Sequence, residues 1–219
     1  DQDFHSIEGR IILESFRVSN IPTVEVAHGY FTDPLLIGIL SVRTNYLLLW
    51  SNGQREKLSQ VLVDREPTAL KSFGLPRSLT MRRSATVYNR AMILLPDLND
   101  LISGKSFLTL SDCVEIAVSL LSFGFHPFLR PRPRDRRKAS VDSELLMSGI
   151  EVSNDSLEHD FGISKIVFGE PSSVLFEAAE NGILAVQYAL EGTSLIENVV
   201  RVDQVKDFCE ILRKFERLS

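Results

Sequence analysis

Short continuous apolar runs alternate along this chain with segments in which apolar residues recur at helical spacing, and this alternation is the strongest constraint on its fold. From residue 91 onward, apolar runs occupy 91–97, 126–132, 164–170 and 184–189, and helical patterns occupy 111–124, 141–149, 172–182 and 203–218. A strand buried on both faces of a parallel sheet reads as a continuous apolar run, and each crossover to the next parallel strand usually contains a helix. The sequence therefore predicts an α/β fold, a Rossmann-like parallel sheet covered by helices.

The N-terminal part shows the same alternation in a shorter form. It contains a helical pattern at 5–18, apolar runs at 21–29 and 44–50, and a helix at 51–63 that Ser51 or Asn52 would cap. Residues 73–90 combine Gly, Pro, Ser and Arg with little periodicity, which is typical of a linker. We expect two domains: 1–85, a partial N-terminal α/β unit with the linker, and 86–219, a Rossmann-like domain.

The composition is that of an ordinary globular protein. The 219 residues are 44% hydrophobic, which is enough for a sizeable core. No apolar run reaches the roughly 18 residues that a membrane span needs, and residues 1–10 lack a signal-peptide pattern. The two cysteines, Cys113 and Cys209, fall in separate helical patterns, which favours reduced core thiols in a cytoplasmic protein. The apolar runs 34–40 and 123–128 are expected in the core, with peripheral contact at the inner membrane face as the alternative.

Charge is spread unevenly over the chain. The formal net charge is −5, and residues 151–219 carry 13 acidic against 6 basic residues, yet residues 130–138 hold six positive charges in nine positions. A concentrated basic segment in an acidic protein indicates an anion bound locally. Because this run is short and no aromatic residue interleaves with it, we do not expect a nucleic-acid partner.

Two adjacent serines mark the turn from the run 164–170 into the helix 172–182. The first N–H groups of a helix lack partners, and the helix dipole places partial positive charge there. Ser172 and Ser173 add hydroxyl donors, and Glu177 lies one turn further on the same face. This arrangement could hold a phosphate with the hydroxyls and a sugar hydroxyl with the carboxylate. Plain N-capping by a serine is the alternative.

Arginines and a histidine follow two other expected strands. Arg130, Arg132 and Arg134 alternate with prolines, so an extended strand end would project them together. Ligands bind outside the carboxyl ends of strands in open α/β sheets, and arginine suits bidentate phosphate recognition. His28 stands at the end of the run 21–29, where it could act as a general base. A solvated basic loop and a structural histidine are the alternatives.

Four segments form one pattern: "IPTVEVAHG" at 21–29, "FGLPRS" at 73–78, "RPRPRD" at 130–135 and "GEPSSVLFEAAENGILAVQY" at 169–188. Together these segments resemble bacterial GT-B glycosyltransferases of surface polysaccharides. The nearest relatives in pattern are capsule and polysialic-acid-type transferases and teichoic-acid glycerophosphotransferases. The resemblance implies two Rossmann-like domains facing a cleft, the C-terminal one holding an activated nucleotide sugar.

The resemblance also implies roles for individual residues. Ser172 and Ser173 match the serine motif that binds the donor phosphates, and Glu177 matches the helix acid. His28 matches the histidine of the "HG" turn on the acceptor side, and Asp33 in the following loop is the alternative base. The donor would be a nucleotide sugar, the acceptor a polysaccharide or glycolipid, and no other cofactor is expected. The expected route is metal-independent and inverting.

The sequence departs from the family pattern at two places. Such proteins typically read "RPHPR" where this chain reads "RPRPR", so Arg132 occupies the expected histidine position. Arginine binds phosphate but keeps its proton near neutral pH, so it is a poor acid or base there. His126 lies at the start of its run, at the wrong end for this role. The sheet before residue 28 is represented by one helix and one strand, so most of a conventional N-terminal domain is not seen.

Three functions fit these observations. The first is the transferase, with donor phosphates bound by Ser172, Ser173, Arg130 and Arg132. The second is a non-catalytic nucleotide-binding or assembly protein that keeps the GT-B fold and acts as a homo-oligomer or with a partner chain. The third is a sugar-nucleotide epimerase or hydrolase of the same architecture.

Overall fold

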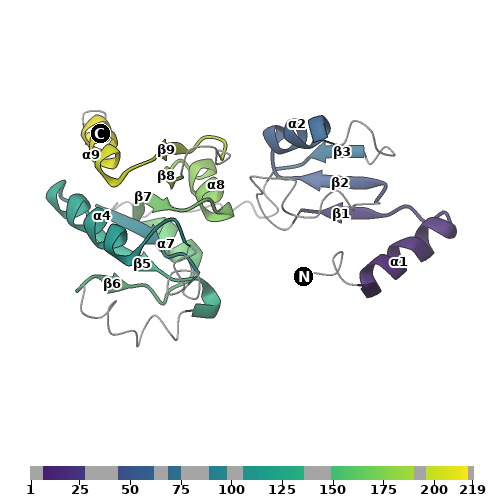
Figure 1. The fold of residues 1–219 in the computed structure, drawn as a ribbon, viewed down its shortest axis with the longest axis horizontal. Helices are drawn as coiled ribbons and strands as arrows, with labels where there is room; N and C mark the ends of the chain where they lie inside the picture. The colour runs from purple at the N-terminus through teal and green to yellow at the C-terminus, as the bar shows by residue number, and fades with distance from the viewer. Residues whose placement is uncertain are drawn as a thin grey trace. The chain divides into compact units, whose positions relative to one another are not determined.

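The computed structural model describes residues 7–27, 44–61, 69–74, 89–97, 106–135, 149–189 and 196–216. The chain forms two compact units, 1–78 and 79–219, and Figure 1 draws their described elements and labels most of them. The sequence placed this boundary at 85, inside the segment 75–88, which lies outside the described residues.

The N-terminal unit is built on a three-stranded parallel sheet in the order β1-β2-β3. Its elements are α1 (Ile7–Val18), β1 (Val24–Val26), β2 (Tyr46–Leu49), α2 (Asn52–Val61) and β3 (Ala69–Ser72). Helix α2 connects β2 to the parallel strand β3 and packs against both. The expected strand 21–29 is confirmed only in its centre, and β3 was not expected from the sequence.

The ends of these strands are fixed by hydrogen bonds around Trp50. Its indole nitrogen donates to the carbonyl oxygen of Ala27 at 2.7 Å, and its backbone N–H donates to Oε1 of the buried Gln54 at 2.9 Å. The backbone N–H of Gln54 donates to Ser51 Oγ at 3.1 Å. Ser51 therefore caps α2, one of the two residues expected for this role.

The C-terminal unit is a six-stranded parallel sheet in the order β6-β5-β4-β7-β8-β9. Its strands are β4 (Arg90–Leu94), β5 (His126–Arg130), β6 (Glu151–Val152), β7 (Ser164–Gly169), β8 (Leu184–Tyr188) and β9 (Val200–Val202). Its helices are α4 (Leu110–Ser122), α7 (Leu157–Ile163), α8 (Ser173–Glu180) and α9 (Val205–Glu216), with the 3-10 turn η2 at Pro133–Asp135. Counted from β4, the strand order is 3-2-1-4-5-6, which is the Rossmann order.

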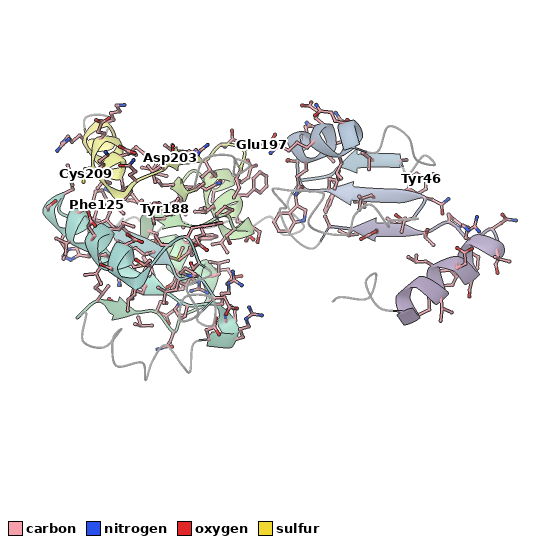
Figure 2. The ribbon with its side chains drawn as sticks, in the orientation of Figure 1. Tyr46, Phe125, Tyr188, Glu197, Asp203 and Cys209 are labelled. Carbon is pink, nitrogen blue, oxygen red and sulfur yellow. The ribbon has the colours of Figure 1, made fainter. Side chains whose placement is uncertain are left out.

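Both faces of this sheet are covered. Alternate residues of the strands, among them Ile93, Ile166 and Val186, form one core with α4 and α9. Phe168 lies at its centre, with its ring 5.0 Å from that of Phe208 and 6.2 Å from that of Tyr188, which Figure 2 labels. The residues between them on the strands are also buried, and α7 and α8 pack on β7 and β8. The predicted α/β fold with a helix-covered parallel sheet is confirmed.

Several element ends differ from the expectation. Helix α4 is capped by Thr109, whereas Ser111 or Asp112 was expected, because Thr109 and Asp112 form a reciprocal capping box. Strand β5 ends at Arg130 rather than continuing to 132, since the chain then turns into η2. The expected helix 141–149 lies almost wholly outside the described residues. Within the described ranges, no helix is long and apolar enough to cross a membrane.

Candidate functional site

The strand order of the C-terminal unit singles out one edge of its sheet. β4 lies between β5 and β7, so the chain runs outward in both directions from this point. In open parallel α/β sheets, ligands bind outside the carboxyl ends of the strands at such a reversal. The segments that follow β4, β5 and β7 carry Asp97, Arg132 with Arg134, and Ser172 with Ser173. The fold therefore brings residues from three separate sequence segments to one edge.

The turn after β7 is tied to the segment before α4. Oε1 of Glu170 accepts hydrogen bonds from the backbone N–H of Leu108 at 2.7 Å and from Ser106 Oγ at 2.6 Å. Gly169 allows the close approach of β7 to β4, because a Cβ on it would lie 2.8 Å from Leu94 Cβ. The carboxyl end of the sheet is therefore fixed by the carboxylate of Glu170 and by the close approach of β7 to β4 that Gly169 allows.

Only some of the hydrogen-bonding groups at the N-terminus of α8 have partners among the residues of this turn. Ser172 is the N-cap, and its Oγ accepts from the backbone N–H of Val174 at 3.2 Å. The backbone N–H of Leu175 donates to the carbonyl oxygen of Ser172 at 3.0 Å. Ser173, the first residue of α8, is half-buried, and its hydroxyl makes no hydrogen bond with another described residue. The N-capping alternative thus holds for Ser172, whereas the hydroxyl of Ser173 takes no part in the cap.

At the N-terminus of α4, the helix that follows β4 in the chain, the backbone N–H groups of Leu108, Thr109 and Asp112 already have side-chain acceptors. The carboxylate of Asp112 accepts from the backbone N–H of Thr109 at 2.8 Å, and Thr109 Oγ1 accepts from the N–H of Asp112 at 3.1 Å. The N–H of Leu108 is occupied by Glu170. Asp112 also places a negative charge in the first turn, whereas the first turn of α8 has no acidic residue. An anion at this edge would therefore be favoured at α8 over α4.

Arg130 is buried in an internal ion pair. It is 7% exposed, and its Nη1 binds Oδ2 of Asp160 and lies 3.2 Å from the carbonyl oxygen of Asp155. Asp160 in turn accepts from Ser153 Oγ at 2.7 Å. The expectation that Arg130 projects together with Arg132 and Arg134 is wrong, because the strand ends at Arg130 and the chain turns. Its role as a phosphate ligand stays a prediction, and the described contacts show a structural one.

Arg132 and Arg134 instead reach the buried Asp97. Nη2 of Arg134 forms an ion pair with Oδ2 of Asp97, and Nη1 of Arg132 lies 3.6 Å from the same oxygen. Both arginines are exposed, Arg132 by 52%, whereas the Asp97 side chain is only 6% exposed. These exposed arginines follow β5, and α8 follows β7, the strand on the other side of β4.

The remaining predicted residues are placed less completely. Glu177 lies in α8 and is half-buried, and its carbonyl oxygen accepts from Asn181 Nδ2 at 2.8 Å. The role of its carboxylate toward a sugar stays a prediction. His28 and Asp33 lie outside the described residues. Among the residues that are described, no group of three or more His, Cys, Asp or Glu side chains is placed to hold a metal ion.

Asp97 and Glu170 are the residues of this edge that sequence reasoning did not assign. Asp97 ends the apolar run 91–97, and Glu170 precedes the two serines, so both stand at strand ends where polar groups gather. Their partners, however, are many positions away in the chain, which no local pattern indicates.

One comparison with known proteins found a likeness, and it is a likeness in structure. No protein-family model matches the sequence, and no curated protein matches it by sequence. The solved structure of the GtfA/B complex is similar to this chain, with a TM-score of 0.55 and 11% identity, over 97% of this chain and 48% of that one. The chain therefore spans about half the length of that protein chain. At this identity the likeness shows the fold alone, an α/β fold with parallel sheets flanked by helices, as expected from the sequence.

Proposed function

We propose that this chain binds the activated nucleotide donor of a glycosyltransferase and serves the transfer of a sugar, or a sugar-phosphate-like group, to a surface-polysaccharide or glycolipid acceptor. The observation that carries the proposal is the edge of the six-stranded sheet. There Ser173, whose hydroxyl has no partner among the described residues, and the exposed Arg132 follow the two strands that flank β4. Hydroxyl donors, a helix N-terminus and a guanidinium are groups that bind phosphate. The glycosyltransferase-like fold supports this reading.

The proposed reaction is an inverting, metal-independent displacement. An acceptor hydroxyl oxygen forms a bond to the anomeric carbon, the bond from that carbon to the donor phosphate oxygen breaks, and the nucleotide leaves with the electron pair. Ser173 and Arg132 would stabilise the charge on the leaving phosphate. His28, or Asp33, would take the proton of the acceptor hydroxyl. Glu177 would accept a hydrogen bond from a sugar hydroxyl.

Calorimetric titration of the full chain with CMP, CDP, UDP and GDP tests the proposal. We expect one nucleotide to bind saturably, and Ser173→Ala and Arg132→Ala each to weaken it roughly tenfold. Glu151→Gln is the matched control, because it breaks the ion pair of Arg90 at the opposite, amino end of β4. If none of the four nucleotides binds at millimolar concentration, the proposed function is wrong for this chain.

A non-catalytic nucleotide-binding protein is the second candidate. Arg132 stands where the resemblance expects a histidine, and it lies 3.6 Å from the carboxylate of Asp97, so this position binds anions without exchanging protons. Incubation with the nucleotide sugar of the bound class, followed by product analysis, separates the candidates. Transfer to an acceptor supports the transferase, binding without turnover supports the second candidate, and turnover without acceptor indicates an epimerase or hydrolase.

A further inference from the structure

A buried carboxylate with two exposed arginines stands at the end of the central strand β4. Asp97 is 4% exposed, three residues beyond Leu94, and its Oδ2 binds Arg134 and lies 3.6 Å from Arg132. The arginines are 52% and 67% exposed at their side chains. The acid is therefore withdrawn into the protein while the guanidinium groups face outward.

The backbone of the two arginines is held as well. Arg132 and Arg134 are separated by Pro133, which opens the 3-10 turn η2, and the N–H of Asp135 donates to the carbonyl oxygen of Arg132 at 2.9 Å. Proline fixes its own backbone angle and restricts the residue before it. The turn thus fixes the backbone of both arginines, and Asp97 holds the guanidinium of Arg134 in an ion pair and attracts that of Arg132 from 3.6 Å.

We propose that Asp97 is a positioning residue, which holds the guanidinium groups of Arg132 and Arg134 over the carboxyl end of β4 so that they form a preorganised subsite for the donor phosphates. This inference rests on the proposed function. A long arginine side chain loses rotamer entropy when it binds a ligand, and a side chain already held in place loses less. Asp97 thus lowers the local positive charge by one, which weakens attraction of a phosphate. It offsets this by holding the arginine side chains in the position that binds the phosphate.

The two effects of Asp97 have opposite signs, which makes the inference testable. Replacing Asp97 by Asn removes a negative charge beside the phosphate site, so simple electrostatics predicts tighter nucleotide binding. If Asp97 acts by positioning, the same variant binds more weakly, because the amide carries no charge to hold the guanidinium groups.

Calorimetry on the full chain would use whichever of CMP, CDP, UDP and GDP binds the unaltered protein. We expect Asp97→Asn to weaken it roughly tenfold and Arg132→Ala to add little further loss in the double variant, since Asp97 acts through Arg132. Binding by Asp97→Asn as tight as that of the unaltered protein, or tighter, would overturn the inference, and so would fully additive losses. Glu151→Gln is again the control for a broken ion pair elsewhere on β4.

Thermal unfolding checks that Asp97→Asn remains folded. Should it unfold, Arg134→Lys takes its place, because this exposed side chain keeps its charge but loses the planar fork. We expect severalfold weaker binding of the same nucleotide, and unchanged binding would overturn the inference. Absence of binding by the unaltered chain contradicts the proposed function itself, which separates that failure from a failure of this inference alone.

Discussion

Glu170 Oε1 accepts a 2.7 Å hydrogen bond from the backbone N–H of Leu108, although 62 positions separate the two residues in the chain. Leu108 is fully buried, and truncating Glu170 removes the side-chain acceptor of its N–H. Glu170→Ala should lower the free energy of unfolding of the C-terminal unit by about 1–3 kcal/mol, since a buried donor is left unsatisfied. Glu170→Gln keeps an acceptor oxygen and should cost less than half as much. Urea unfolding followed by circular dichroism measures both, and equal losses would contradict the assignment.

The buried ion pair of Arg130 and Asp160 should matter far more for stability than exposed pairs of the same sheet. Asp160→Ala leaves the guanidinium of Arg130 buried and uncompensated, and we expect a loss of about 3–5 kcal/mol. Glu151→Gln breaks the pair with Arg90, where the glutamate is 61% exposed, and should cost about 1 kcal/mol or less. The two variants are compared by urea unfolding, and similar losses would show that burial of Arg130 is not the deciding factor.

The two serines at the start of α8, the N-cap Ser172 and the first helical residue Ser173, should affect different properties, one stability and the other binding. Ser172→Ala removes the N-cap and should lower the free energy of unfolding by about 1 kcal/mol. Ser173→Ala removes a hydroxyl without a described partner and should change stability by less than about 0.5 kcal/mol. Thermal and urea unfolding of both variants, set beside their nucleotide affinities, check this division. A loss of stability in Ser173→Ala as large as that in Ser172→Ala would contradict it.

The two cysteines should react at different rates. Burial raises the pKa of the Cys113 thiol to about 12, and the charges of Asp112 and Glu170 add to the effect. Cys209 is only half-buried, on α9 as Figure 2 shows, with its Sγ 3.7 Å from Ser119 Oγ. Because the thiolate is the reactive form, a thiol reagent at pH 8 should modify Cys209 in the native protein and Cys113 only after unfolding. Mass spectrometry of the modified peptides distinguishes them, and Cys209→Ser should abolish the native-state reaction.

Glu25 should make the stability of the N-terminal unit depend on pH. Burial raises the pKa of its carboxyl, and its Oε2 has no hydrogen-bond partner among the described residues. The folded unit then binds more protons than the unfolded chain between the ordinary glutamate pKa of about 4.3 and the raised folded value, so this group's contribution to stability falls as pH rises through that window. Glu25→Gln should therefore be more stable than the unaltered chain at pH 7 and lose that advantage below about pH 4.3.

Trp50, the single tryptophan, lies in the same unit, so its fluorescence during urea unfolding reports this transition. A difference between Glu25→Gln and the unaltered chain that stays constant from pH 4 to 8 would contradict the role of the carboxyl.

Much of the C-terminal unit could be predicted because its signals are local. The apolar run 164–170 followed by Ser172 and a helical pattern specifies strand β7, a cap and helix α8, and the structure has these elements. The cap of α4 was predicted wrongly, because Ser111, Asp112 and Thr109 are all good caps and only the formed capping box distinguishes them. Strands β6 and β9 are two and three residues long, too short for a period to show.

By itself, the sequence determined the kinds of elements and their order, since the apolar period of a strand or helix is written in neighbouring residues. It could not tell Arg130 from Arg132 and Arg134, which alternate identically with prolines. Only the tertiary structure decided that Arg130 is buried on Asp160, 30 positions away, while Arg134 pairs with Asp97, 37 positions in the other direction. The physical reason is that the partner of a charge is set by strand pairing, and strand pairing depends on contacts between segments far apart in the chain.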